Sequence, residues 1–292
     1  MAGHSLGSKS PFRTVTLWLI WGWLLIFALL PNILVIAVSF LTRDSSAFIS
    51  LPVSIDSYIR MIDPLYFGVF IHSLWMAGIT TIICLLLGYP FAWLIAKAKT
   101  RWQPLLMMLL ILPFWTNSLV RTYALKLLFA NNGLINKSLL AIGIIDAPID
   151  ILYTQVAVIA GLTYLLFPFM VLPLYAVFTD LRNDMLLASQ DLGASKTQTF
   201  WHIILPLTTP GIISGVLLVL LPAMGMFYVA DILGGSRNLL VGNIIKNQFL
   251  DARDWPFGAA ASVLLTLAMV VLLLAYRASS RRIGKTDFNE VA

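Results

Sequence analysis

The stretch Leu187-Ala-Ser-Gln-Asp-Leu-Gly-Ala-Ser-Lys-Thr-Gln-Thr-Phe-Trp-His-Ile-Ile-Leu-Pro206 is a polar segment between two long apolar ones, and its spacing predicts two short helices joined by a sharp elbow. Gly193 predicts the elbow, because glycine adopts the left-handed conformation that ends many helices without steric cost. Ser195 is followed three residues later by Gln198, which is typical of a capping box at the start of the second helix. Pro206 is expected to end that second helix.

The second helix of this segment is predicted to be amphipathic. Phe200, Ile203 and Ile204 recur at i, i+3 and i+4 and form one apolar stripe, while Ala188 and Ser189 keep the first arm of the elbow thin. Such a shape suits the groove of a partner protein. The alternative is an amphipathic loop that lies on its own membrane or packs against its own helices.

The composition is that of an integral membrane protein. The 292 residues are 60% hydrophobic and 11% charged, with a mean hydropathy of +0.90. The one cysteine, Cys84, lies in an apolar run and excludes a disulfide framework. The three histidines, His4, His72 and His202, fall in no metal-ligand spacing, so we expect no metal site and no cofactor.

Six segments are long and apolar enough to cross roughly 30 Å of hydrocarbon. They are predicted at about residues 17–40, 69–96, 104–129, 154–178, 210–233 and 256–276. The first is expected to be retained rather than cleaved, because it is too long for a signal peptide and lacks a small-residue cleavage site. The second is expected to be interrupted at Gly88 and Pro90, and a short surface helix is predicted at 55–61.

The predicted fold is therefore an all-α, polytopic membrane protein with six transmembrane helices. Four parts are expected: an N-terminal tail of residues 1–16, a first helix and outer segment of residues 17–68, a main transmembrane domain of residues 69–276 that contains the loop 179–208, and a basic tail of residues 277–292. Asp254, close before Pro256, predicts the start of the last helix.

The distribution of Lys and Arg predicts the orientation. One side of the predicted topology holds eleven of the nineteen: Lys9, Arg13, Lys97, Lys99, Arg101, Arg182, Lys196, Arg277, Arg281, Arg282 and Lys285. The other side holds six: Arg43, Arg60, Lys137, Arg237, Lys246 and Arg253. The bias places both termini and the elbow in the cytosol. Anchoring to anionic lipid accounts for the net charge of +6, so no nucleic-acid partner is inferred.

The sequence offers no catalytic residues. The run from Gly193 to Thr197 contains a Lys followed by Thr, but a phosphate-binding loop needs Gly directly before the Lys, another Gly five residues earlier and a preceding strand. Ser, His and Asp do not meet at a common membrane depth either. Energy for any transport must therefore come from another protein.

Polar groups in the fifth span suggest a path for a solute. In one continuous helix Met224, Tyr228 and Asp231 would share a face, flanked by Phe227. A carboxylate beside aromatic rings suits an alkylammonium, through charge and cation-π attraction. The alternative is that Asp231 only caps the outer end of the helix.

Further features of the spans concern packing and the path. In the third span Trp115, Asn117 and Arg121 lie on the outer half, and Arg121 is a candidate partner for Asp231. In the fifth span the GxxxG spacing of Gly211 and Gly215 is expected to let another helix approach closely. Pro222 is expected to kink that span.

The opening stretch resembles the cytoplasmic loop of the permease subunits of ABC importers, whose pattern reads E-A-A, three residues, G, nine residues, I-x-L-P. Five residues match it: Ala188, Gly193, Ile203, Leu205 and Pro206. Leu187 replaces the usual Glu, and Ser189 replaces an Ala. The resemblance implies the importer type I permease fold and a coupling loop formed by Ala188, Gly193, Ala194, Phe200, Ile203, Leu205 and Pro206. Without the carboxylate, docking would depend more on shape and apolar contact, or a sister permease would supply the Glu.

A narrower resemblance covers roughly residues 23–277. The stretches 63–67, 87–93, 113–118, 221–231 and 253–259 resemble the B-type permease subunits of spermidine/putrescine ABC importers. This implies a non-enzymatic subunit of the bacterial inner membrane, which forms the polyamine path with a second permease. A cytosolic ATPase dimer and a periplasmic polyamine-binding protein are the other implied partners.

Two alternatives remain open. A related permease for another solute, such as a phosphonate, thiamine or iron(III), would share the elbow, and an anionic solute would use Arg121 and Lys126 rather than Asp231. A membrane-bound assembly or signalling subunit would explain six spans and a partner-binding loop without transport. Such a subunit would not need kinked, aromatic-lined helices.

Overall fold

The computed structural model describes residues 11–44, 49–181 and 183–289, and side chains over most of that range. Within these residues the chain consists of helices, turns and an isolated β-bridge between Thr42 and Ser50. It divides into two compact units, Met1–Asp63 with Asn247–Leu265 and Pro64–Lys246 with Thr266–Ala292. Several predicted anchoring charges lie outside the described side chains: Lys9, Arg13, Arg182, Arg277, Arg281, Arg282 and Lys285.

In the first unit, the predicted first span is a helix in three parts: α1 (Pro11–Leu24), a π-helical turn (Leu25–Leu29) and α2 (Leu30–Ser39). The π turn ends two residues before Pro31, which has no N–H and crowds the carbonyl four residues earlier, that of Phe27 in the turn, so the widened turn accommodates the proline. The predicted surface helix is confirmed as α3 (Asp56–Met61).

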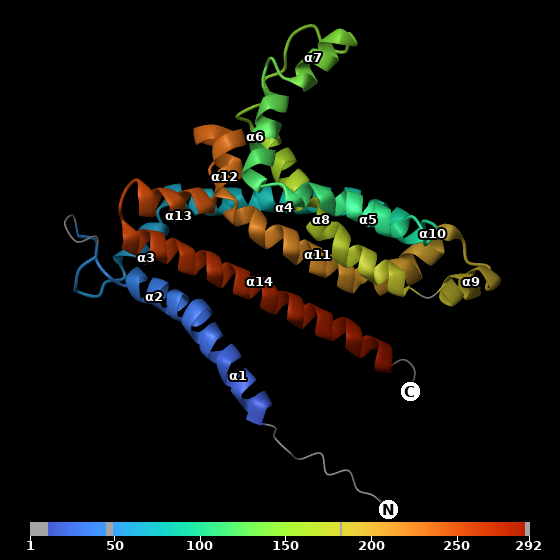
Figure 1. Cartoon of the computed structure of the whole chain (residues 1–292), viewed down its shortest axis with the longest axis horizontal. Coiled ribbons are helices and arrows are strands. Elements are labelled where there is room, and N and C mark those ends of the chain that lie inside the picture. Colours follow the sequence, from blue (N-terminus) through green and yellow to red (C-terminus); the bar gives the residue numbers. More distant parts are fainter. Residues whose placement is uncertain (1–10, 45–48, 182, 290–292) are drawn as a thin grey trace, which may run out of the picture. The chain divides into compact units, whose positions relative to one another are not determined.

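In the second unit, α4 (Pro64–Lys97), α8 (Gln155–Asp180) and α11 (Leu205–Gly225) pack against one another (Figure 1). The close approach predicted at Gly211 and Gly215 is confirmed. A Cβ on Gly211 would lie 2.9 Å from Val177 of α8, and a Cβ on Gly215 would lie 2.6 Å from Met170 of α8. The predicted interruption of the second span is wrong, since α4 continues through Pro90.

The third predicted span is not one straight helix. It consists of α5 (Gln103–Ile111), a 3-10 turn (Leu112–Trp115) and α6 (Ser118–Phe129), followed by α7 (Leu134–Ala141). The segments Gln103–Trp115 and Ser118–Ala141 meet at 91°. Thr116 is extended, and the side chain of Asn117 accepts a hydrogen bond from the N–H of Leu119 and so caps α6. Among the described residues, five continuous helices are long and apolar enough to span a membrane, and this bent pair could be the sixth.

The fifth span is shifted relative to its prediction. Pro206 does not end the second helix of the elbow, because α10 (Lys196–Thr199), a π turn (Phe200–Ile204) and α11 form one continuous helix. As before Pro31, a π turn ends two residues before the proline and accommodates it. The helix ends at Gly225 rather than near residue 233, because Met226 has φ −75° and ψ 64°.

Short helices follow this break. They are α12 (Phe227–Val229), a π turn (Ala230–Gly234), a 3-10 turn (Gly235–Arg237) and α13 (Val241–Leu250). Helix α13 was not predicted. The last helix, α14 (Trp255–Asn289), begins after Asp254 as predicted and runs beyond the predicted end of its span.

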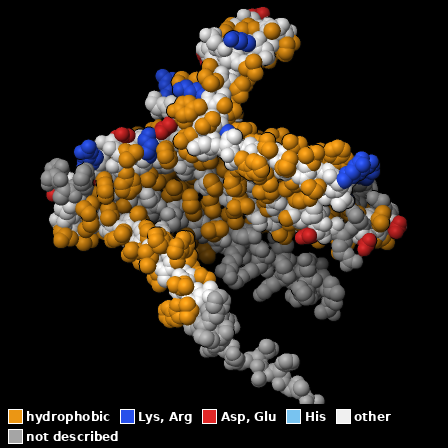
Figure 2. Space-filling model, in the orientation of Figure 1, with side chains coloured by type: hydrophobic (Ala, Val, Ile, Leu, Met, Phe, Trp, Pro, Cys, Tyr) orange, Lys and Arg blue, Asp and Glu red, His pale blue; other side chains and the backbone are white. Residues whose placement is uncertain are grey.

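Hydrophobic side chains cover most of the visible described surface in Figure 2. Many large apolar residues are exposed, among them nearly all those of the first span. A soluble monomer rarely exposes apolar surface on this scale, whereas lipid accommodates it.

Candidate functional site

The elbow has the predicted geometry. Helix α9 (Asn183–Asp191) ends before Gly193, whose φ of +81° is left-handed. The backbone N–H of Ser195 donates to Oε1 of Gln198 at 2.8 Å, and the N–H of Gln198 donates to Oγ of Ser195 at 3.3 Å. Both bonds of the capping box are therefore present.

A hydroxyl pair joins the two arms of the elbow. The hydroxyls of Ser189 and Thr199 lie 3.1 Å apart, and both side chains are buried. The pair links α9 to α10. Ser189, which departs from the importer pattern, thus forms a contact that an alanine could not make.

The apolar stripe of the elbow packs against its own chain. Ile204 is buried, and Phe200 meets the ring of Tyr89 edge to face at 6.0 Å. Phe200 and Ile204 line a cavity of about 720 Å³ together with Trp93 of α4. The hydroxyls of Tyr89 and Thr208 lie 2.9 Å apart, so α4 is joined to the start of α11. Part of the stripe therefore packs against the chain's own helix α4, while Phe200 and Ile204 still line the cavity.

Other apolar residues of the elbow face outward instead. Leu192 is 88% exposed, Trp201 is 60% exposed, and Leu187 is also exposed. Of the remaining predicted coupling residues, Ala188 and Pro206 are exposed, Ala194 lines the cavity, and Ile203 and Leu205 are half-buried. The outward face thus carries no carboxylate at position 187 but three large apolar side chains.

The predicted face of Met224, Tyr228 and Asp231 does not exist, because the helix breaks between the first two. Met224 is buried inside α11. After the break, Phe227 and Tyr228 form an edge-to-face pair with centroids 6.0 Å apart. Asp231 lies in the π turn that follows, so an acid and two aromatic rings still share one short segment.

Asp231 pairs with Lys246 and Asn243. Its Oδ2 lies 2.7 Å from Nζ of Lys246, and its Oδ1 accepts a hydrogen bond from Nδ2 of Asn243. The hypothesis that Asp231 pairs with Arg121 is therefore wrong. Both partners lie on α13, which was not predicted, although Val241, Ile244 and Ile245 have helical spacing.

Arg121 lies at the edge of an apolar cavity of about 880 Å³ between α4, α5, α6 and α8. Its guanidinium carbon stacks 4.5 Å above the ring of Phe114, and its Nε and Nη1 atoms are buried without a hydrogen-bond partner. The other two residues predicted in this span differ in role. Asn117 caps α6, whereas Trp115 is 79% exposed.

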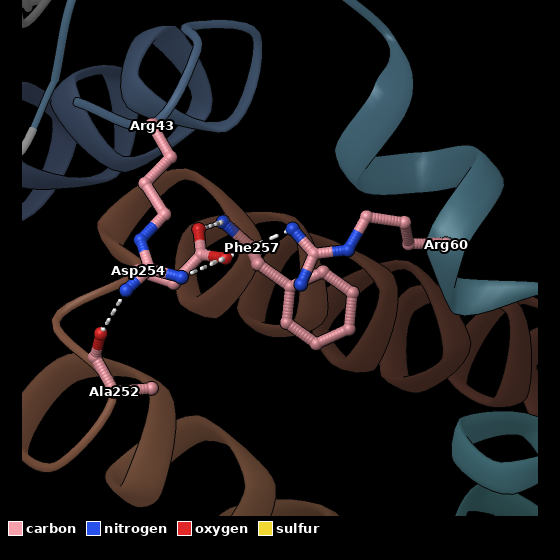
Figure 3. A network of polar contacts seen from close by, with 5 residues as sticks. All are labelled: Arg43, Arg60, Ala252, Asp254 and Phe257. Carbon is pink, nitrogen blue, oxygen red and sulfur yellow. Dashed lines mark hydrogen bonds and ion pairs between the residues drawn. The ribbon is translucent and has the colours of Figure 1, made fainter. Parts of the chain in front are cut away.

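A second polar cluster lies in the first unit (Figure 3). Asp254 is buried, its Oδ1 accepts from the N–H of Phe257 at the start of α14, and its Oδ2 lies 2.8 Å from Nη1 of Arg60. Arg60 also stacks on Phe257 at 4.4 Å, and Arg43 donates to the carbonyl of Ala252 at 2.8 Å. Asp254 thus anchors the segment after α2 to the start of the last helix. The sequence revealed only its capping role.

No group of three or more His, Cys, Asp or Glu side chains could hold a metal ion within the part of the chain that the structure describes. The candidate functional residues are those of the elbow and of the break after α11.

Comparison with known proteins identifies the class. The model of the family "binding-protein-dependent transport system inner membrane component" matches residues 85–285, and the chain belongs to this family. It is a non-enzymatic permease component of a transport system and a protein of the bacterial inner membrane.

Close relatives are named after one transport system. The chain is 56% identical to the spermidine/putrescine transport system permease protein PotB of Escherichia coli K12, over 90% of this chain and 96% of that protein. It is 55% identical to PotB of Salmonella typhimurium LT2 and 53% identical to PotB of Haemophilus influenzae, in each case over 95% of this chain and 97% of the relative.

Solved structures agree on the fold. The crystal structure of a bacterial alginate ABC transporter in complex with an alginate pentasaccharide-bound periplasmic protein contains a chain that superposes with a TM-score of 0.76. The match covers 93% of this chain and 94% of that one at 16% identity. The predicted importer type I permease fold is confirmed.

Proposed function

We propose that this protein is the permease subunit of an ATP-driven polyamine importer, in which it forms the translocation path with a second permease subunit. The observation that carries the proposal is identity of 53 to 56% to spermidine/putrescine permeases along nearly the whole of both chains. A cytosolic ATPase dimer drives the cycle, and a periplasmic binding protein delivers spermidine or putrescine.

The path includes Phe227, Tyr228 and Asp231. The side chain of Asp231 is 33% exposed, and Phe227 is partly exposed beside it. A carboxylate attracts an ammonium group, and aromatic faces attract it further. Trp115 is exposed and available to line the path. Asn117 and Arg121 influence the path indirectly. The side chain of Asn117 caps α6, and that of Arg121 stacks on Phe114.

The elbow is the coupling loop that docks on the ATPase. Its outward face carries Leu187, Leu192 and Trp201, so docking relies on apolar contact and on the bend at Gly193. The elbow and both termini lie in the cytosol, as the distribution of Lys and Arg indicates.

Uptake by reconstituted vesicles tests the function. The complete transporter is placed in liposomes with ATP on the ATPase side, and labelled spermidine, putrescine, thiamine and a phosphonate are offered with their binding proteins. We expect ATP-dependent entry of the polyamines alone. Asp231→Asn should reduce polyamine uptake while the complex still assembles, and unchanged uptake would reject Asp231 as part of the path.

Chemical labelling tests the orientation. Cys84 is buried, and it is the one cysteine of the sequence, so replacing it with Ser leaves a background for single cysteines. Leu192→Cys in that background, expressed without the ATPase that would cover this face, should react with a membrane-impermeant maleimide in inside-out vesicles and not in intact spheroplasts. Labelling from the periplasm would reverse the topology.

A further inference from the structure

One oxygen of the Asp231 carboxylate is held by a fixed partner. Asn243 is fully buried, and its Nδ2 donates both to Oδ1 of Asp231 and to the carbonyl of Phe227. Its Oδ1 accepts from the backbone N–H of Leu240 at 2.9 Å. Both donor hydrogens and the oxygen of the amide are in use, so this side chain has little freedom to move.

The start of α13 is equally constrained. The backbone N–H of Val241 donates to Oγ of the buried Ser73 in α4 at 2.9 Å. A Cβ on Gly242 would collide with the carbonyl oxygen of Gly225, so α13 packs directly on the end of α11. The scaffold that presents Asp231 is thus rigid on the side of Asn243.

The other oxygen has a movable partner. Nζ of Lys246 lies 2.7 Å from Oδ2, and the two side chains are 28% and 33% exposed. A lysine ammonium is a compact charge on a flexible four-carbon stem. Partly exposed ion pairs add little net stability, so this contact breaks readily.

We propose that Lys246 is a resident counter-ion of Asp231 and that the terminal ammonium of a polyamine displaces it during transport. This inference rests on the proposed function. The end of putrescine or spermidine is also a primary ammonium on a short alkyl chain, so it fits the place that Nζ of Lys246 occupies on Oδ2. Asn243 keeps the carboxylate in position while the two cations exchange.

The exchange has a consequence for release. The carboxylate is paired before the cargo arrives, while it is bound and after it leaves, since Lys246 returns to Oδ2. Competition from Lys246 weakens the binding of the polyamine. The apparent affinity is the intrinsic affinity multiplied by the fraction of molecules whose carboxylate is free. The site therefore guides the cargo without trapping it.

Equilibrium binding tests the exchange. Labelled spermidine is titrated into the purified complex of both permeases and the ATPase, without the binding protein. If Lys246 occupies the carboxylate in about nine molecules in ten, Lys246→Met should tighten the dissociation constant about tenfold. Lys246→Arg should weaken binding, because the guanidinium fork holds a carboxylate more firmly. In an Asp231→Asn background, Lys246→Met should have no effect.

Controls separate the outcomes. Lys137→Met removes one exposed cation elsewhere and should leave binding unchanged, which excludes a general effect of net charge. Unchanged or weaker binding in Lys246→Met would overturn the exchange. If Lys246→Met fails to assemble, the Lys246→Arg variant decides. Unchanged or tighter spermidine binding in Lys246→Arg would then reject the exchange. A wild-type complex that neither binds nor imports spermidine would instead reject the proposed function itself.

Discussion

The bend at Gly193 offers a sharp test of the coupling loop, because its replacement perturbs only the backbone. At φ +81° a residue with a Cβ is strained, yet a Cβ at this position would meet no atom within 4 Å. The left-handed conformation costs an L-residue roughly 1–2 kcal/mol. Gly193→Val should therefore lower the ratio of bent to unbent elbow by about 5- to 30-fold, since about 1.4 kcal/mol corresponds to a factor of ten.

The affinity for the ATPase should fall by up to the same factor, because only the bent form presents the docking face. The measurement is the dissociation constant of the ATPase from the detergent-solubilised permeases, followed by ATP-driven uptake in vesicles. Gly193→Asn should lose less, since asparagine visits the left-handed region more readily.

Gly143 provides a matched control. It has φ +75°, and a Cβ there would also meet no atom within 4 Å, so Gly143→Val introduces the same strain in another loop. This variant should keep normal affinity for the ATPase. If Gly193→Val binds the ATPase as well as the wild type does, or if Gly143→Val weakens binding equally, the bend is not the docking determinant.

Three further predictions concern stability, measured as thermal unfolding of the purified complex. Gly215→Val should destabilise the complex by about 1–3 kcal/mol, because the new side chain overpacks against α8. Gly78→Val is the control, because a Cβ there meets no atom within 4 Å, and it should not destabilise the complex. Equal melting temperatures for the two variants would contradict the close packing at Gly215. Tyr89→Phe should cost about 0.5–1.5 kcal/mol through the lost bond to Thr208, and no cost in Tyr89→Phe would show that bond to be dispensable. Asp254→Ala should cost more than Asp254→Asn, because both remove the charge but only Asn keeps the capping oxygen, worth about 1 kcal/mol; an equal or smaller cost of Asp254→Ala would show that this capping bond does not stabilise the protein.

The elbow could be predicted because its chemistry is local. Gly193, Ser195 and Gln198 lie within six residues, and their bonds form inside one turn of chain. The surface against which the apolar stripe packs could not be predicted. Amphipathic spacing shows that Phe200 and Ile204 need cover, but it does not say whether Tyr89 of α4 or another protein provides it.

The breaks in the third and fifth spans were missed for a related reason. Proline and glycine occur throughout these helices, and α4 and α8 continue through theirs. The helix that ends at Gly225 is followed by Phe227, whose carbonyl accepts a hydrogen bond from Asn243, 16 residues away in sequence. At Gly225 the break coincides with the packing of α13, which a local sequence pattern does not reveal.

The sequence alone determined that this is a polytopic membrane protein of the importer permease class, because hydropathy, charge bias and the elbow pattern depend on neighbouring residues. The tertiary structure decided which charges meet. Asp231 joins Lys246, and Asp254 joins Arg60 across 194 positions of sequence. Such pairs depend on how distant segments pack, and no local pattern specifies that packing.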